Sequence, residues 1–145
     1  MSDLAEIPQT CACLHTRMTA RAVTRVYDEA LRPIGLKITQ FALLSAIDMG
    51  IGGSISDLAE RLAFERTTLT RNLQLLKDNG FIVPRAGTGR AVAYAMTPKG
   101  QKAMAEAIPL WKTAQARIEE RLGPAQWEAT RNHLRALRRA ALQAA

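Results

Sequence analysis

The residues SDLAERLAFERTTLTRNLQLLKDNGFIVPRAGTGRAVAYAMT, Ser56–Thr97, decide the fold. Apolar residues recur at helical spacing over residues 56–64, and Ser56 is placed to cap the N-terminus of this helix. After a turn at residues 64–66, a second helix is predicted to begin near Thr67 and to end at Asn79-Gly80, a typical left-handed C-terminal signal. One face of the second helix is apolar and is predicted to be buried: Leu69, Leu73 and Leu76.

The opposite face of the second helix is polar and mostly basic. It carries Arg66, Thr67, Thr70, Arg71, Gln74 and Lys77, with Asp78 as its one acid. Two helices joined by so short a turn, the second of them polar outward, predict a helix-turn-helix. An α-helix has about the diameter that the major groove of B-DNA accepts, so we expect the second helix to enter that groove.

A β-hairpin is predicted directly after the second helix. Residues 81–83 form a strand pattern, residues 87–89 have turn chemistry, and Val92, Tyr94 and Met96 alternate with alanines. Arg85 and Arg90 bracket the turn, so a cationic tip is expected, and an arginine there suits the narrow, negative minor groove. The alternative is an interaction module with the same winged shape, in which these arginines only aid solubility.

Composition limits the class of protein. The 145 residues are 48% hydrophobic and fit one compact domain or a tightly joined pair. No apolar run is long enough to span a membrane, and no signal segment is apparent, so the cytoplasm is the expected location. A net charge of +7 favours a polyanionic partner, although charge alone does not separate DNA from RNA or acidic lipid.

Helices are also predicted on both sides of this stretch. One runs from about Cys11 to Arg32, and a nearly all-apolar one from Gln40 to Met49 with Thr39 as its N-cap. Ile55 is expected to add a short third strand to the hairpin. Two further helices are predicted over residues 98–122 and 125–142. The fold class is therefore mainly α (α+β).

An ordered set of short motifs resembles the MarR family of winged-helix transcription regulators. The residues that carry the resemblance are Leu58-Ala59, Thr68-Leu69-Thr70-Arg71, Leu76, Asn79-Gly80-Phe81-Ile82, Arg90 and Met96-Thr97-x-x-Gly100. The resemblance covers most of the chain. The wing of the family usually carries Asp-x-Arg, whereas the corresponding residues here are Thr88-Gly89-Arg90.

The resemblance implies a winged helix-turn-helix with a small β-hairpin wing and a helical dimerisation region from both chain ends. On this division residues 1–35 and 99–145 form the dimerisation helices, and residues 36–98 the DNA-binding domain. A two-fold dimer would place two recognition helices about one DNA turn apart on a pseudo-palindromic operator. The alternative is that the terminal helices cover each other within one chain. Members of the family respond to small aromatic ligands or to peroxide, and we expect a repressor released in one of these ways.

Each candidate DNA-binding residue is assigned by its chemistry. Arg71 is the first choice for a bidentate contact to guanine, and Gln74 either reads adenine or stays solvated. Arg90 is the main wing contact, and Arg85 adds to the cationic wing. Phosphate contacts are expected from the remaining residues: Arg66, Thr67, Thr68, Thr70 and Lys77.

The most reactive side chains of the chain are clustered near its start: Cys11 and Cys13, close to His15. A disulfide between them would close a small, strained ring and is not expected. Three interpretations stay open: quiet buried thiols, an oxidation sensor near a helix N-terminus, or a metal site completed from elsewhere. In the hydroperoxide-sensing branch of the MarR family a cysteine near the start of this helix is the sensor. Cys13 and Tyr27 match that branch, whereas Arg17 replaces a second tyrosine.

An enzyme is not predicted. The sequence has no Gly-rich phosphate loop and no paired carboxylates in the expected cleft, and its histidines are His15 and His133. No cofactor and no membrane partner are predicted. The favoured function is a homodimeric, sequence-specific DNA-binding transcription regulator, and the alternative is a winged-helix module that binds protein or RNA without an operator of its own.

Overall fold

The computed structural model describes residues 3–87 and 89–145 and forms two compact units, which are treated separately. The first unit extends to Trp111 and the second is Lys112–Ala145. In chain order the elements are η1 (Asp3–Ala5), α1 (Ile7–Thr10), α2 (Ala12–Leu31), η2 (Arg32–Ile34), α3 (Ile38–Asp48), α4 (Ile55–Leu62), α5 (Arg66–Asp78), β1 (Ile82–Ala86), β2 (Val92–Met96), α6 (Pro98–Leu122) and α7 (Pro124–Ala144). The described residues are mainly helical with one small sheet, which confirms the predicted fold class, mainly α (α+β). Thr88, in the predicted turn, lies outside the described residues.

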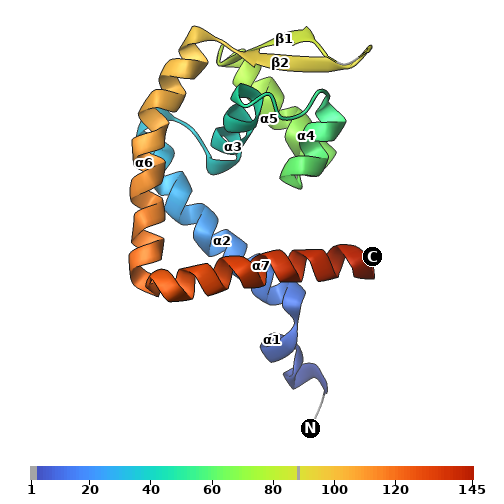
Figure 1. Ribbon diagram of the computed structural model, residues 1–145, viewed down its shortest axis with the longest axis vertical. Coiled ribbons are helices and arrows are strands. Elements are labelled where there is room, and N and C mark those ends of the chain that lie inside the picture. Colours follow the sequence, from blue (N-terminus) through green and yellow to red (C-terminus); the bar gives the residue numbers. More distant parts are fainter. Residues whose placement is uncertain (1–2, 88) are drawn as a thin grey trace. The chain divides into compact units, whose positions relative to one another are not determined.

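The helix-turn-helix and the hairpin lie together in the first unit. Figure 1 shows α3, α4 and α5 gathered on one side of the β1–β2 hairpin. The two strands pair antiparallel, with Ile82 opposite Met96 and Ala86 opposite Val92. The core beneath them is aliphatic and consists largely of leucines: Leu31, Leu36, Leu43, Leu44, Leu58, Leu69, Leu73 and Leu76. The burial of the apolar face of α5 is confirmed, and α3 is buried on most of its surface, as its composition predicted.

The helix predicted from about Cys11 to Arg32 is confirmed as α2, which begins directly after Cys11. This residue has φ −67° and ψ 108°, an extended conformation that ends α1 and precedes α2. The short helix α1 that precedes it was not predicted. Because Cys11 occupies the N-cap position, Cys13 lies in the first turn of α2.

The start of α3 is fixed by the end of α2. The N-cap is Lys37 and not Thr39 as predicted. The Oδ1 atom of Asp28 accepts a hydrogen bond of 2.8 Å from the Ile38 N–H, and Lys37 Nζ lies 3.4 Å from Asp28 Oδ2. A carboxylate from the preceding helix satisfies an N–H donor that would otherwise lack a partner at the helix end.

The start of α4 differs from the prediction in two ways. Ser54, and not Ser56, is the N-cap, and its hydroxyl accepts a hydrogen bond of 3.1 Å from the Asp57 N–H. Ile55 is the first residue of α4, so the predicted third strand was wrong, and the sheet of the described residues has two strands. Asp57 Oδ2 in turn accepts from the Gly53 N–H at 3.1 Å, which holds the loop before α4.

The turn between α4 and α5 lies one residue earlier than predicted, at residues 63–65. Ala63 adopts a left-handed conformation, with φ 54°, and ends α4. Arg66, which was placed in the turn, is already the first residue of α5. Its side chain therefore belongs to the N-terminal turn of the recognition helix.

The second unit contains the end of α6 and the whole of α7. Gly123, with φ 82°, separates the two helices and turns the chain sharply (Figure 1). Several apolar side chains of α7 are exposed in the single chain, among them Leu134 at 48% and Leu142 at 72%. An arginine row of the same helix is exposed as well: Arg131, Arg135, Arg138 and Arg139.

Candidate nucleic-acid interface

Helix α5 presents its polar face to solvent. Leu69, Leu73 and Leu76 are 0–2% exposed and anchor one side of the helix in the core. The candidate contact residues on the other sides are all exposed: Arg66, Thr67, Thr68, Thr70, Arg71, Gln74 and Lys77. The structure therefore brings these seven residues together on one accessible helix.

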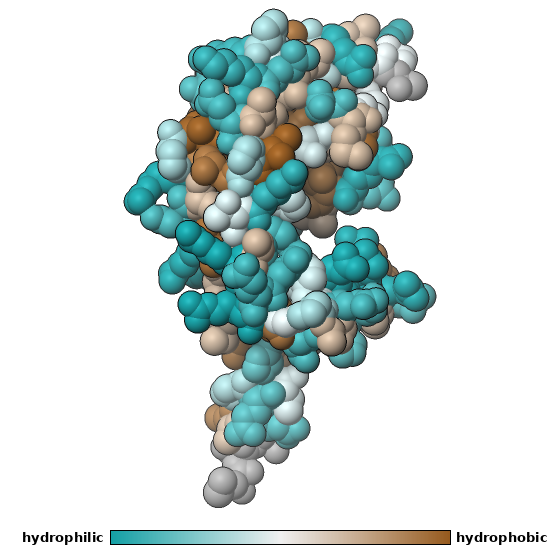
Figure 2. All heavy atoms as spheres, turned by 60° about the vertical axis from the view of Figure 1, so that its left-hand side comes forward, coloured by the Kyte–Doolittle hydropathy of each residue, from teal (hydrophilic) through white to brown (hydrophobic). Residues whose placement is uncertain are grey.

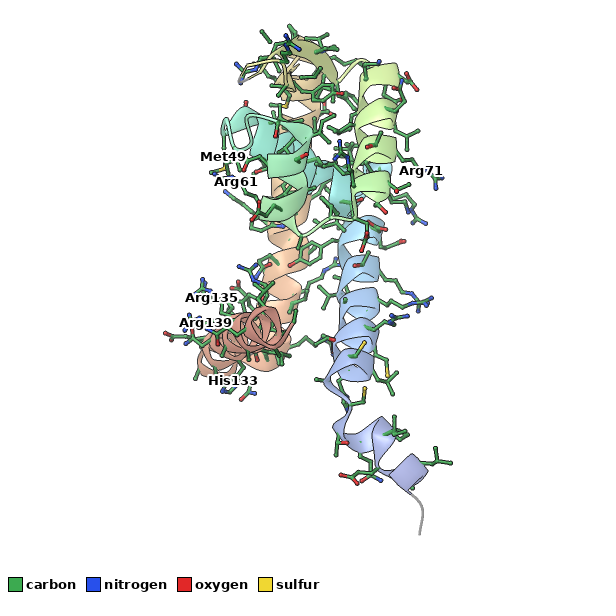
Figure 3. All side chains as sticks on the ribbon, turned by 90° about the vertical axis from the view of Figure 1, so that its right-hand side faces the viewer. Met49, Arg61, Arg71, His133, Arg135 and Arg139 are labelled. Atoms are coloured by element: carbon green, nitrogen blue, oxygen red, sulfur yellow. The ribbon has the colours of Figure 1, made fainter. Side chains whose placement is uncertain are left out.

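Arg71 projects from the middle of this helix. In Figure 3 its side chain points outward from α5 into open space. Arg61 of α4 points to the other side of the winged core in the same view, and its Nε donates to Asp57 Oδ1 at 3.0 Å. Arg71 thus has the freedom that a base contact requires, whereas Arg61 is engaged with its own helix.

Two of the candidate contact side chains on α5 are bound to their own helix. The Thr70 hydroxyl donates to the Arg66 carbonyl at 2.9 Å, and Gln74 Nε2 donates to Asp78 Oδ1 at 2.6 Å. A bidentate contact to adenine needs both the amide nitrogen and the amide oxygen of a glutamine. Gln74 would have to leave Asp78 to make it, which favours a secondary role for this residue.

The two wing arginines differ in position. Arg85 lies within β1, and its Nε donates across the hairpin to the Tyr94 carbonyl at 3.1 Å. Arg90 lies between the strands and is exposed. Arg85 is consequently held along the strand, and Arg90 is the wing arginine at the tip.

The turn end of the wing lies close to the loop before α4. Gly87 N–H donates to the Ala91 carbonyl at 2.9 Å. A Cβ atom on Gly87 would lie 2.5 Å from that oxygen and 2.7 Å from the carbonyl oxygen of Gly53. Only glycine permits such close backbone approach, so this contact holds the turn end of the wing against the loop before α4.

The cysteines and Tyr27 lie at different places on α2. Cys11 is half-buried and Cys13 exposed, and both thiols are free. Tyr27 is buried near the other end of the helix, about 21 Å along the axis from Cys13 at about 1.5 Å per residue. One chain therefore does not bring Tyr27 to Cys13.

Among residues 3–87 and 89–145, no group of three or more His, Cys, Asp or Glu side chains comes together in a way that could hold a metal ion. No helix in the same described ranges is long and apolar enough to cross a membrane.

Comparisons with known proteins agree with this geometry. A sequence profile of the MarR family matches residues 34–91. The transcriptional regulator MosR of M. tuberculosis is 40% identical, with a TM-score of 0.82 over 92% of this chain and 96% of that chain. The chain belongs to the MarR family. It is a DNA-binding transcription regulator with the winged helix of that family.

Two further structures extend the comparison. MosR in complex with DNA is 38% identical, with a TM-score of 0.82, and covers 92% of this chain and 98% of that one. The repressor CouR bound to a 23-mer DNA duplex shares 21% identity and the fold, with a TM-score of 0.80 over 94% of this chain and 98% of that chain. Comparison with curated protein sequences gave no match.

The sequence reasoning missed the residues that support the interface of this MarR-family chain. Lys99 Nζ donates to the Asn79 carbonyl at 2.7 Å, and Thr97 Oγ1 donates to the Gly80 carbonyl at 2.6 Å. The available signal was Thr97-Pro98-Lys99-Gly100, a threonine N-cap before a proline at the first helical position. It predicts the start of α6 but not its partner at the end of α5.

Proposed function

We propose that this MarR-family regulator represses transcription as a homodimer on a pseudo-palindromic operator. The observation that carries the proposal is the exposed polar face of α5, held in place by three buried leucines and followed directly by an arginine-bearing wing. The DNA complex of MosR, a relative of 38% identity, supports the same use of the fold here. We expect the protein to act in the cytoplasm and to have no enzymatic activity.

In the proposed complex each half-site is read by two elements. Arg71 contacts a guanine edge in the major groove, and Arg90 enters the adjacent minor groove. The other exposed residues of the polar face of α5 hold the phosphates, with Arg66 and Thr67 at the positive N-terminal end of the helix. Arg85, which is bonded along β1, contributes its charge to the wing.

Exposed apolar side chains support the dimer. In the first unit Met18 is 61% and Val26 37% exposed on α2, and in the second unit Leu137 is 39% exposed on α7. A hydrophilic surface interrupted by apolar patches is also visible in Figure 2. Burial of such side chains is favourable at about 25 cal/mol per Å² of apolar area, so we propose that helices from both chain ends pair with a second copy.

The experiment that tests the proposal is selection of duplexes from a random-sequence pool by the wild-type protein. The expected result is an enriched inverted repeat whose half-sites are about one helical turn apart, bound by a particle with the mass of two chains in light scattering. Enrichment of no sequence, or a monomer at micromolar concentration, would refute the proposal. Preferential capture of RNA would favour the interaction module instead.

The contribution of the wing is tested by replacing Arg90 with alanine. Binding to the selected duplex should weaken, and the slope of log K against log salt should fall by about 0.9 for each phosphate that the variant no longer neutralises. Fluorescence anisotropy at several salt concentrations measures both quantities. Arg121→Ala, an exposed arginine of α6, removes the same charge outside the proposed interface and should leave the slope unchanged. Equal salt slopes for the wild type, Arg90→Ala and Arg121→Ala would mean that Arg90 is not part of the DNA interface.

We propose that the repressor is released from DNA by one of two signals, a small aromatic ligand or oxidation of Cys13. For oxidation, the exposed thiolate of Cys13 would attack a peroxide oxygen and form a sulfenic acid while the other oxygen leaves as hydroxide or alcohol. Since Tyr27 is remote from Cys13 within one chain, a sensor that uses both would take the tyrosine from a second copy.

Peroxide treatment of the reduced protein–DNA complex tests Cys13. Oxidation of the wild type should lower its affinity by about 5- to 150-fold, the usual range of coupling between two sites. The Cys13→Ser variant should stay bound, and Cys11→Ser, which changes the neighbouring half-buried thiol, should still be released. Release that survives Cys13→Ser would exclude the sensor role.

A further inference from the structure

The end of the recognition helix and the start of α6 form a compact joint. We call it the α5–α6 joint and define it by Asn79, Gly80, Thr97, Lys99 and Gly100. Asn79 is the C-cap of α5, and Gly80 has the left-handed φ of 73° that ends the helix. Both of their carbonyl oxygens accept side-chain hydrogen bonds from the beginning of α6: Asn79 from Lys99 and Gly80 from Thr97.

Lys99 is suited to this position by charge as well as by hydrogen bonding. The last carbonyls of a helix have no partner within the helix and carry the negative end of its dipole, so a cation there is favourable. Lys99 Nζ lies 2.7 Å from the Asn79 oxygen and 5.3 Å from the centroid of the Phe81 ring. The ammonium group thereby contacts the C-cap residue of α5 and Phe81, the residue directly before β1.

Backbone contacts leave little room for movement at the same point. Thr97 N–H donates to the Phe81 carbonyl at 3.0 Å, and Gly100 N–H donates to Thr97 Oγ1 at 3.0 Å. A Cβ atom on Gly100 would lie 2.2 Å from the Phe81 oxygen. The joint therefore depends on close backbone approach, and Lys99 closes its exposed side.

The chain enters the hairpin and leaves it again beside this joint. Strand β1 begins at Ile82 and β2 ends at Met96, each within two residues of the contacts described. We propose that Lys99 is a positioning residue for DNA recognition, which holds the recognition helix and the wing at the angle that lets Arg71 and Arg90 engage one duplex. The proposal rests on the operator binding proposed above and adds a residue that acts from behind the interface.

The test compares Lys99→Met with Lys102→Met and Lys99→Arg. Methionine keeps most of the length of the lysine side chain and removes the ammonium group. Lys102, an exposed lysine one turn further along α6, supplies the same loss of charge outside the joint. Lys99→Arg retains the cation and a donor. For each protein, affinity is measured for the duplex selected by the wild type and for a shuffled duplex of the same composition, at several salt concentrations, together with the melting temperature.

Lys99→Met should lower the ratio of selected to shuffled affinity by about three- to tenfold, the effect of one hydrogen bond of typical net strength. The salt slope of Lys99→Met should equal that of Lys102→Met. Lys99→Arg should keep the ratio of selected to shuffled affinity that the wild type has. A slope lower by about 0.9 for Lys99→Met alone would make Lys99 a phosphate contact and overturn the proposal. An unchanged ratio, with or without a lower melting temperature, would overturn it too. A wild type without preference for any duplex would instead refute the proposed function.

Discussion

Replacing Leu73 with alanine is expected to lower the free energy of unfolding by about 2–5 kcal/mol. Leu73 is 2% exposed in the middle of α5, between Leu69 and Leu76, so the substitution removes buried methyl groups and leaves a cavity. A domain of this kind is stable by only about 5–15 kcal/mol, and the loss is a large fraction of that. Urea denaturation followed by circular dichroism measures it as a lower midpoint at unchanged slope.

Leu75→Ala is the matched control for this substitution. Leu75 is in the same helix but is 41% exposed, so the same chemical change should cost about 1 kcal/mol or less. Both variants must be compared at one protein concentration, because unfolding of a dimer depends on it. Equal losses for the two variants would mean that the buried leucines do not anchor the recognition helix.

Replacing Arg71 with alanine is expected to weaken binding to the selected duplex by about 1–3 kcal/mol and to relax the base preference at one position in each half-site. The reason is the loss of the bidentate contact to guanine that we propose for Arg71, which an alanine side chain does not replace. Competition between the selected duplex and single-base variants of it measures both effects. The fold should be unaffected, because Arg71 is exposed and projects into solvent (Figure 3).

Two other arginines separate a base contact from general charge. Arg61→Ala removes the same charge from α4, where the side chain points to the other side of the core (Figure 3), and should leave the base preference intact. Arg66→Ala should weaken binding to all duplexes alike, as expected for a phosphate contact. A preserved base preference in Arg71→Ala would assign sequence reading to another residue of α5.

The sequence predicted the winged helix because its strongest signals are local. Leucines at helical spacing placed the buried side of α5, and Asn79-Gly80 placed its end, where Gly80 indeed has φ 73°. The N-cap of α4 was predicted wrongly as Ser56, because Ser54 is an equally good N-cap by composition. The choice depends on where the loop from α3 passes Gly87 of the wing, which is a tertiary contact.

The residues that support the candidate interface could not be predicted from the sequence for a similar reason. Lys99 and Asn79 lie 20 residues apart in sequence, and no periodic pattern links a lysine at a helix start to the last carbonyl of an earlier helix. The direction of Arg85 along β1 was also not predictable, since it depends on the register that places Tyr94 opposite Pro84. The exposed positions of the candidate contact residues can thus be predicted from pattern and charge, whereas the residues that would orient them require coordinates.

The stacking of Trp111 on Phe41 gives the molecule a built-in optical reporter. The two rings have centroids 6.1 Å apart and planes inclined by 15°, and they join α6 to α3 within the first unit. The other tryptophan, Trp127, belongs to the second unit. Each unit therefore carries one tryptophan, and since indole emission depends on local polarity, a variant that keeps only one of them reports on its own unit without an attached dye.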